Sequence, residues 1–325
     1  MVGAESVLVT GGAGFIGSHL IDRLLADGHR VRCYDNFTSG KREFLAHHAK
    51  NPNLQIIGGD VMERAALAEA MKGVDLVFHL AANPDVRIGA TSSRIHLDQN
   101  VIATYEVLEA MRAAGVRRLG FTSTSTVYGE TDRIPTPEDF GPLFPISLYG
   151  ASKLACEALI SGYAHTFDFE TVSYRFANVV GPRSTHGVTY DFYHKLRADP
   201  KRLEILGDGR QKKSYVHVSD TVEAMVHTMR MAKAKAEVFN IGSRDAITVT
   251  EIANLVVAEM GLKDVTYHFT GGVDGGRGWK GDVKVMRLDT SKLERTGWHP
   301  KMGSAESIAA TARALVDEGK KAPVK

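Results

Sequence analysis

Two side chains whose types and spacing suit proton transfer are Tyr149 and Lys153. They lie four residues apart within residues 148–167, which are predicted to form a helix, so an ammonium group shares one helix face with a phenol. A nearby positive charge favours the phenolate and lowers the pKa of the tyrosine toward the range that a general base needs. A Tyr-x-x-x-Lys pair is frequent by chance, so the assignment depends on the motifs around it.

A run of five hydroxyl side chains, residues 122–126, begins where the strand predicted at residues 116–122 ends. Threonines are good strand formers, which alone would account for some of this run. Hydroxyls at the carboxyl end of a strand can also hydrogen-bond a hydroxyl of a substrate. The run therefore strengthens the assignment of Tyr149 and Lys153 to a candidate site.

A glycine-rich turn near the N-terminus predicts a dinucleotide site. A short apolar strand at residues 6–10 runs into Gly11-Gly12-Ala13-Gly14-Phe15-Ile16-Gly17 and then into a helix. The glycines permit a tight turn and close approach to a pyrophosphate, and the helix N-terminus offers unpaired N–H groups to that anion. Asp35, after the next strand at residues 30–34, suits the ribose hydroxyls of NAD and would repel the 2′-phosphate of NADP. The positive charge of nicotinamide would lower the pKa of Tyr149 further.

Composition excludes several classes of protein. The chain has 325 residues, 43% of them hydrophobic, and a net charge of +2 from 40 basic and 38 acidic residues. A globular protein that binds no nucleic acid is expected, because the basic residues form no stripe. Cys33 and Cys156 are expected to be buried thiols in a reducing compartment. No apolar run approaches the ~20 residues of a membrane span and no signal peptide precedes the first strand, so we expect a cytoplasmic protein without a membrane partner. The sequence predicts no metal site.

Strand and helix patterns alternate over the first half of the chain, which predicts an α/β fold with a doubly wound parallel sheet. Strands are expected at residues 6–10, 30–34, 54–58, 74–81, 116–122 and 171–177, and helices at 17–27, 63–71, 95–114 and 148–167. Two all-apolar segments, residues 76–78 and 119–121, suit the centre of the sheet. The predicted Rossmann domain comprises residues 1–177 with about 216–243. A smaller C-terminal substrate-binding domain comprises about 178–215 and 244–325, with a clear helix only at 250–260.

Together these residues resemble the extended short-chain dehydrogenases/reductases, and within them the nucleotide-sugar 4-epimerases of the UDP-galactose/UDP-glucose 4-epimerase type. The resemblance covers essentially the whole chain. Besides the glycine turn and Tyr149 to Lys153, it is carried by Asp35-Asn36, Thr38-Ser39-Gly40, Gly59-Asp60-Val61, His79-Leu80-Ala81-Ala82, Thr126-Val127-Tyr128-Gly129, Arg175 to Arg183, Tyr215-Val216-His217-Val218 and Gly281-Asp282-Val283.

The resemblance implies which residues hold NAD. In that reading Asp60 accepts a hydrogen bond from the adenine amino group, and Lys153 holds the nicotinamide ribose. The implied cofactor-binding residues are Gly11, Gly14, Phe15, Ile16, Gly17, Asp35, Asn36, Thr38, Ser39, Gly40, Asp60, Val61, Leu80, Ala81, Ala82, Asn100, Ser123, Tyr149, Lys153 and Phe176.

The resemblance also implies a reaction, the interconversion of UDP-galactose and UDP-glucose through a 4-keto intermediate. Tyr149 would be the acid/base, Thr124 would hydrogen-bond the reacting sugar hydroxyl, and Lys153 would tune Tyr149. A homodimer through the helices at 95–114 and 148–167 is also implied. The implied substrate-binding residues are Arg87, Ser125, Thr126, Asn178, Arg183, Lys213, Tyr215, Arg277 and Asp282.

Other reactions of this family are distinguished by the two residues before Val127-Tyr128-Gly129. Sugar 4,6-dehydratases carry Asp-Glu there and UDP-glucuronate decarboxylases carry a Glu in the second position, whereas this chain has Ser125 and Thr126. Neither hydroxyl can do that proton chemistry, so an epimerase is favoured. A non-catalytic NAD-binding sensor is the alternative from another class, and the retained Tyr149 and Lys153 disfavour it.

The substrate itself stays open because the chain departs from the family pattern around the diphosphate. Lys213 stands where 4-epimerases usually have an arginine, and Trp279-Lys280-Gly281-Asp282 replaces Arg-Pro-Gly-Asp. Arg277 is expected to supply the missing guanidinium. Arg87 and Arg183 could instead bind a substrate carboxylate, which keeps a UDP-glucuronate/UDP-galacturonate 4-epimerase as an alternative. Met286 leaves N-acetylated sugars open as well.

Overall fold

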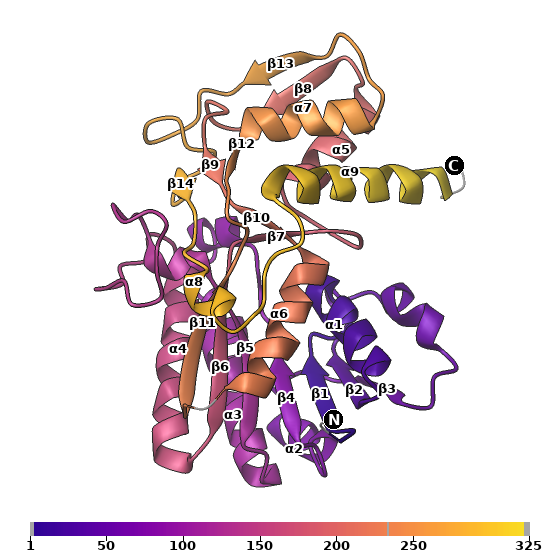
Figure 1. Cartoon of the computed structure of the whole chain (residues 1–325), viewed down its shortest axis with the longest axis vertical. Coiled ribbons are helices and arrows are strands. Elements are labelled where there is room, and N and C mark those ends of the chain that lie inside the picture. The colour runs from indigo at the N-terminus through magenta and orange to yellow at the C-terminus, as the bar shows by residue number, and fades with distance from the viewer. Residues whose placement is uncertain (1–2, 233, 322–325) are drawn as a thin grey trace. The chain divides into compact units, whose positions relative to one another are not determined.

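A seven-stranded sheet in the order β11-β6-β5-β4-β1-β2-β3 is the central feature of the fold in the computed structural model, which describes residues 3–232 and 234–321 (Figure 1). Residues 322–325, the end of the predicted second domain, lie outside the described residues. The strands are β1 (Ser6–Thr10), β2 (Arg30–Asp35), β3 (Leu54–Gly58), β4 (Leu76–His79), β5 (Arg118–Thr124), β6 (Glu170–Phe176) and β11 (Ala236–Ile241). β1 pairs in parallel with β2 and β4, β2 with β3, and β4 with β5.

This sheet confirms the predicted doubly wound α/β fold. The apolar segments at residues 76–78 and 119–121 lie in β4 and β5, inside the sheet, as predicted. β4 is shorter than the predicted strand at 74–81, and β11 is a strand that the prediction lacked. Cys33 and Cys156 are buried free thiols, also as predicted.

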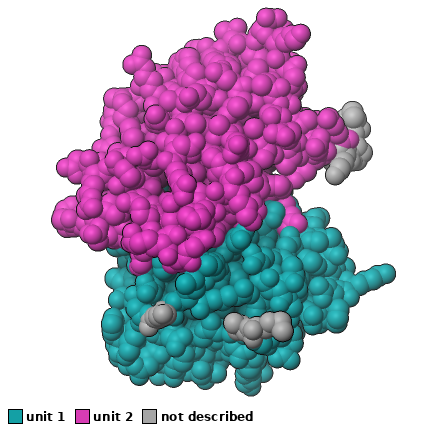
Figure 2. All heavy atoms as spheres, viewed as in Figure 1, with its two compact units in different colours: residues 1–127, 147–175, 222–239 teal, residues 128–146, 176–221, 240–325 magenta. Residues whose placement is uncertain are grey.

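The chain divides into two compact units, coloured separately in Figure 2. The first unit contains the described residues of 1–127, 147–175 and 222–239, and the second those of 128–146, 176–221 and 240–325. Among the described residues, no helix combines the length and the apolar character that crossing a membrane requires.

Helices cover both faces of the sheet in the first unit. α2 (Arg64–Ala70), α3 (Ala103–Ala114) and α4 (Leu148–Phe167) share one buried apolar cluster with Leu8 of β1. Val7 and Val9 point to the opposite face, because successive side chains of a strand alternate. α1 (Phe15–Ala26) and the first unit's part of α6 (Val218–Met231) lie on that side (Figure 1).

Shorter helical segments complete the first unit. η1 (Arg42–His48) and η2 (Val86–Ala90) are 3-10 helices, and η3 (Leu97–Ile102) is a π-helix that runs directly into α3. The sequence predicts one continuous helix at 95–114, so the π-helical start is a difference. A 3-10 helix, η4 (Ser125–Tyr128), follows β5.

The second unit is built around its own apolar cluster, which α5 (Val188–Ala198), α7 (Val249–Glu259) and α9 (Ser304–Lys321) share with short strands. α7 confirms the predicted helix at 250–260, whereas α5 was not predicted. The remaining elements are β7 (Asn178–Val180), β8 (Arg202–Ile205), β9 (Lys212–Lys213), β10 (Tyr215–His217), β12 (Ile247–Thr248), β13 (Thr266–Phe269), β14 (Val285–Met286) and α8 (Ser291–Glu294).

Candidate active site

Two positions of the glycine turn after β1, Gly11 and Gly17, leave no room for a side chain. Gly11 adopts a φ of +66°, and a Cβ there would lie 2.8 Å from the backbone nitrogen of Ala81. A Cβ at Gly17 would overlap the carbonyl oxygen of Gly11. The turn therefore packs against the segment that follows β4 and brings the start of α1 close to β1.

The start of α1 fits the pyrophosphate of a dinucleotide. Gly14 is its N-cap and makes no side-chain cap, so the N–H groups of the first turn, which includes Phe15 and Ile16, are not claimed by a capping side chain. Unpaired N–H groups at a helix N-terminus favour an anion. The backbone of Gly11–Gly17 forms this anion cradle, which together with Asp35 fits NAD.

The carboxylate of Asp35 is hydrogen-bonded to two loops, the glycine turn and the loop after β2. One of its carboxylate oxygens accepts from the N–H of Ala13 at 2.9 Å and the other from that of Phe37 at 2.8 Å. A Cβ at Gly40 would lie 2.7 Å from the carboxylate, so the loop after β2 closes tightly over it. A buried carboxylate here repels a further phosphate, which supports NAD over NADP.

Five predicted cofactor-binding residues, among them the adenine residues Asp60 and Val61, lie after β2 and β3. The amide of Asn36 donates to the carboxylate of Asp60 at 3.0 Å, and the N–H of Thr38 donates to Asn36 at 3.0 Å. Val61 is partly buried against the apolar cluster of the first unit, while Ser39 is exposed. The structure therefore brings these five residues to the carboxyl edge of the sheet.

A buried polar pair that the prediction did not assign supports the next loop. The hydroxyl of Thr10 accepts from the N–H groups of Leu80 and Ala81 and lies 2.8 Å from His79 Nδ1. Burial lowers the pKa of His79 to about 3, so its imidazole is neutral at physiological pH. A polar residue ending each of two buried strands was the signal that could have identified this pair.

Tyr149, Thr124 and Lys153 meet at the carboxyl end of β5. A hydrogen bond joins Thr124 to Tyr149, and Lys153 Nζ donates to the carbonyl oxygen of Thr122 at 2.8 Å. Desolvation raises the pKa of Tyr149 to about 12, although the bond to Thr124 opposes this, and burial lowers the pKa of Lys153 to about 8. The predicted lowering of the tyrosine pKa is therefore wrong for the chain's own residues, because desolvation of the phenol outweighs its hydrogen bond to Thr124.

Asn100 supports the turn of α4 that carries Tyr149. Its amide oxygen accepts from the N–H of Asn83 at 2.8 Å, and its amide nitrogen donates to Ser152 Oγ at 2.9 Å. Ser152 Oγ in turn donates to the carbonyl oxygen of Tyr149 at 2.7 Å. The π-helix η3 thus presents Asn100, a predicted cofactor residue, to both the Asn83 loop and α4.

A buried ion pair lies directly behind the hydroxyl run. Glu157 accepts from Arg175 at 2.7 Å, both side chains are under 10% exposed, and Ser123 Oγ donates to Glu157 at 2.5 Å. The predicted cofactor residue Ser123 therefore directs its hydroxyl to Glu157. Glu157 follows Lys153 by four residues on α4, and that spacing was the available signal.

The two residues after Thr124 carry hydroxyls, as the sequence requires. The Thr126 hydroxyl and backbone N–H both lie 3.2 Å from Thr124 Oγ1, and Ser125 is buried. The side chains at both positions beside Thr124 are therefore uncharged.

Three predicted substrate residues of the second unit form one charge cluster with Glu130. Lys213 Nζ lies 2.5 Å from a carboxylate oxygen of Asp282, and its ammonium lies 5.4 Å from the ring centre of Trp279. Arg277 donates to the carbonyl oxygen of Asp282 at 3.0 Å and pairs with Glu130. Arg277 and Lys213 thus share Asp282 as a partner, and acidic residues of the unit hold both cations.

The other predicted residues of the second unit have separate surroundings. The amide of Asn178 donates to the carbonyl oxygen of Ser214 at 3.1 Å, next to Tyr215, which is buried. Phe176 is buried at the end of β6, and Arg183 is partly buried with a left-handed φ of +64°.

Arg87 belongs to the first unit, on η2. The side chain of Arg87 is 55% exposed, and its Nε lies 3.4 Å from a carboxylate oxygen of Asp85. Asp85 is not among the predicted site residues.

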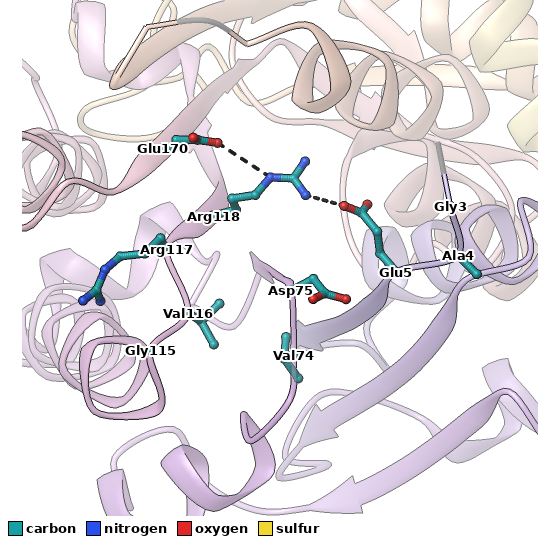
Figure 3. A pocket seen from close by; sticks show the side chains of 10 residues that line it. All are labelled: Gly3, Ala4, Glu5, Val74, Asp75, Gly115, Val116, Arg117, Arg118 and Glu170. Carbon is teal, nitrogen blue, oxygen red and sulfur yellow. Dashed lines mark hydrogen bonds and ion pairs between the residues drawn. The ribbon is translucent and has the colours of Figure 1, made fainter. Parts of the chain in front are cut away.

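A pocket of about 600 Å³ lies at the opposite edge of the sheet, by the amino ends of β1, β4, β5 and β6 (Figure 3). Arg118 in this pocket pairs with Glu5 and Glu170, and Arg117 packs against the ring of Phe169. Ligands of open parallel sheets bind at the carboxyl edge. This pocket is therefore not part of the candidate site.

Comparisons with known proteins match most of the chain. Residues 7–242 match the family described as NAD dependent epimerase/dehydratase family. A UDP-glucose 4-epimerase of Mycolicibacterium smegmatis is 35% identical over 314 residues, 94% of this chain and 96% of that protein. A crystal structure of a UDP-galactose 4-epimerase is 43% identical with a TM-score of 0.86, and the match covers 96% of this chain and 99% of that one.

A relative with a different reaction is similar to almost the same extent. UDP-glucuronic acid decarboxylase 4 of Arabidopsis thaliana is 33% identical over 319 residues, which are 93% of this chain and 66% of that protein. Overall identity thus separates the reactions poorly, and the site residues must do so. The anion cradle and Asp35 fit the cofactor, NAD, and the match over most of the chain establishes that this enzyme belongs to the NAD dependent epimerase/dehydratase family.

Proposed function

We propose that this enzyme is a nucleotide-sugar 4-epimerase that interconverts UDP-galactose and UDP-glucose through a 4-keto intermediate. The observation that carries the proposal is the hydrogen bond between Tyr149 and Thr124. The two positions after Thr124 carry only hydroxyl side chains. Relatives whose names are UDP-glucose 4-epimerase and UDP-galactose 4-epimerase support it.

Tyr149 is the acid/base of the proposed reaction. Thr124 orients the 4-hydroxyl of the sugar, and Tyr149 takes its proton as C4 is oxidised and returns it when C4 is reduced. When bound, NAD would supply the hydride acceptor and donor for C4 and would be regenerated in each turnover. Lys153, held by the carbonyl of Thr122, is placed to bind the nicotinamide ribose.

Hydroxyls at Ser125 and Thr126 support epimerisation over elimination or decarboxylation. A dehydratase needs an acid and a base for the protons at C5 and C6 of the sugar, and a hydroxyl of ordinary pKa can be neither. Because Ser125 and Thr126 cannot transfer those protons, the 4-keto sugar does not lose water. The sugar can then turn over and accept the hydride on its other face.

Lys213, Arg277 and Asn178 are proposed to bind the diphosphate of the substrate. The lysine contributes a point charge and the arginine a planar fork, and together they take the place of the two arginines expected of a 4-epimerase. Asp282 and Glu130 keep both cations in place.

A UDP-glucuronate/UDP-galacturonate 4-epimerase is the second candidate. The exposed guanidinium of Arg87, whose contact with Asp85 is long, could pair with a sugar carboxylate. The decarboxylase relative shows that this family includes proteins named for UDP-glucuronic acid.

We further propose that the enzyme is a cytoplasmic homodimer. The two buried free thiols suit a reducing compartment. An apolar depression on α4 and η3 suits a second copy of the chain. It is lined by Val101, Ala155, Ala158, Leu159, Gly162, Tyr163, Thr166 and Phe167.

The proposal is tested by incubating the purified enzyme with UDP-galactose and, separately, with UDP-glucuronate, without added NAD. Anion-exchange chromatography and proton NMR then identify the products. Formation of UDP-glucose supports the main proposal, and conversion of only the acidic sugar assigns the second candidate. An enzyme that carries NAD but converts neither sugar contradicts both.

A further inference from the structure

Asp22, His47 and His48 form a cluster on the surface of the first unit, away from the residues assigned above. Nε2 of each imidazole lies 2.9 Å from the same carboxylate oxygen, Asp22 Oδ1. The two rings lie 4.1 Å apart between centroids. Asp22 comes from the middle of α1, and the two histidines end η1.

We propose that Asp22, His47 and His48 bind one divalent transition-metal ion. The three candidate ligand atoms all lie within 4.8 Å of one another. Two imidazoles and one carboxylate are a donor set that suits Zn²⁺, Cu²⁺ or Ni²⁺. Mg²⁺ and Ca²⁺ prefer oxygen ligands throughout and are not expected to compete.

Small side-chain movements complete the geometry. In a tetrahedral site with bonds of about 2.0–2.1 Å, the ligand atoms lie about 3.3 Å apart. The two contacts of 2.9 Å must therefore open by a few tenths of an ångström. The imidazole of His47 is 46% exposed and that of His48 19%, so rotation of either ring is feasible, and water can fill the remaining position.

The ion would fasten η1 to α1. Leu45 of η1 is buried, and the histidine end of η1 is hydrogen-bonded to α1 through Asp22. η1 follows the loop at residues 36–40, and α1 begins at the anion cradle, so both are continuous with cofactor-binding segments. A metal bond in place of two surface hydrogen bonds would raise the thermal stability of the first unit.

Sequence reading did not predict this site because Asp22 lies 25 residues before His47 and the pair His47-His48 lacks a metal-binding spacing. Adjacent histidines project in different directions in most helices. Here the 3-10 turn at the end of η1 brings both Nε2 atoms to one carboxylate oxygen.

The test uses NAD-loaded enzyme from which any polyhistidine tag has been removed. Isothermal titration with ZnSO₄ is expected to give one site per chain, and Zn²⁺ is expected to raise the melting temperature. Asp22→Asn, His47→Ala and His48→Ala should each weaken binding by roughly a hundredfold or more, since even indirect supporting residues contribute ten- to a hundredfold. His268→Ala, at an exposed histidine of β13, is the matched control and should bind as the wild type does.

Copper provides a readout that does not depend on stability. The electron paramagnetic resonance spectrum of the Cu²⁺-loaded enzyme should show coupling to two imidazole nitrogens, and His47→Ala or His48→Ala should leave one. Zinc affinity that survives all three ligand substitutions, or the absence of a site in the wild type, would overturn the proposal. Binding lost equally in His268→Ala would reveal only non-specific surface association and would overturn it too.

Discussion

Tyr149 is the residue on which the proposed chemistry depends most directly. Tyr149→Phe removes the acid/base proton and leaves the packing of the ring, so kcat for UDP-galactose should fall about 10²- to 10⁴-fold. NAD should remain bound, because the cradle at Gly11–Gly17 and Asp35 is untouched. Tyr267→Phe, which removes an exposed hydroxyl hydrogen-bonded to Asn254, is the control and should turn over normally. Loss of NAD together with activity in Tyr149→Phe would mean that the tyrosine holds the cofactor instead.

Lys153 should make the stability of the enzyme depend on pH in a defined window. Its pKa is lowered to about 8 from 10.5, so the unfolded chain binds more protons than the folded one between these values. The cost of burying the ammonium is therefore complete below pH 8 and is relieved as the pH rises, by about 1.4 kcal/mol per unit. Lys153→Met removes this dependence.

The measurement is the free energy of urea unfolding of wild type and Lys153→Met from pH 7 to 9.5. Comparing the two proteins cancels the groups that titrate alike in both, such as the buried thiol Cys33. Cys156 is the exception, because the charge of Lys153 lowers the pKa of this thiol and the substitution removes that effect. Wild type should gain stability relative to the variant above pH 8. A constant difference between the two would show that the ammonium stays protonated in the folded protein.

At the residue scale, helical spacing in the sequence identified the pair of Tyr149 and Lys153, and the family resemblance added Thr124. The sequence did not identify what surrounds them. The pKa of Tyr149 depends on how completely its hydroxyl is desolvated, and the partner of Ser123 depends on Glu157 and on an arginine from the neighbouring strand. Both are properties of tertiary packing, which local patterns do not encode.

At the element scale, the ion pair of Glu157 and Arg175 joins α4 to β6 and, through Ser123, to β5. Glu157→Leu or Arg175→Met alone leaves one buried charge uncompensated and should lower the free energy of unfolding by about 3–5 kcal/mol. The double variant should be more stable than either single one, because no unpaired charge remains. Urea unfolding of the four proteins measures the coupling, and additive effects would contradict a direct pair.

The same interaction should also affect catalysis through the position of the hydroxyl run. Thr124 follows Ser123 at the end of β5, so releasing Ser123 from Glu157 should loosen the residue that orients the sugar. Ser123→Ala keeps the ion pair and is the milder variant for this purpose. The fall in kcat for Ser123→Ala, converted to an activation free energy, should exceed the fall in its free energy of unfolding by urea.

Helices and strands were predictable where their periodicity was undisturbed. α4 and α7 match their predicted ranges closely, whereas α5 was missed although Thr189, Phe192, Tyr193 and Leu196 have helical spacing. The glycines, proline and charges around α5 obscured that pattern. The π-helix η3 was not predicted from the sequence, and its residue Asn100 contacts Asn83 and Ser152, which are distant in the chain and leave no mark on local periodicity.

At the scale of the whole molecule, the proposed homodimer follows from the apolar depression on α4 and η3. Ala158 is exposed within this surface, so Ala158→Arg changes no buried contact of the monomer. A guanidinium there stays hydrated in a monomer but would have to be desolvated in a dimer, which is costly without a partner charge. Sedimentation at micromolar concentration should therefore give dimers for the wild type and monomers for Ala158→Arg.

The control for this experiment is Ala66→Arg, which places the same charge on an exposed position of α2, outside the depression. It should remain dimeric, and both variants should keep the circular dichroism spectrum of the wild type. A monomeric wild type would contradict the proposed dimer outright. A dimer that survives Ala158→Arg would place the interface on another surface, because an unpaired guanidinium cannot be buried at the centre of an apolar contact without a large loss of affinity.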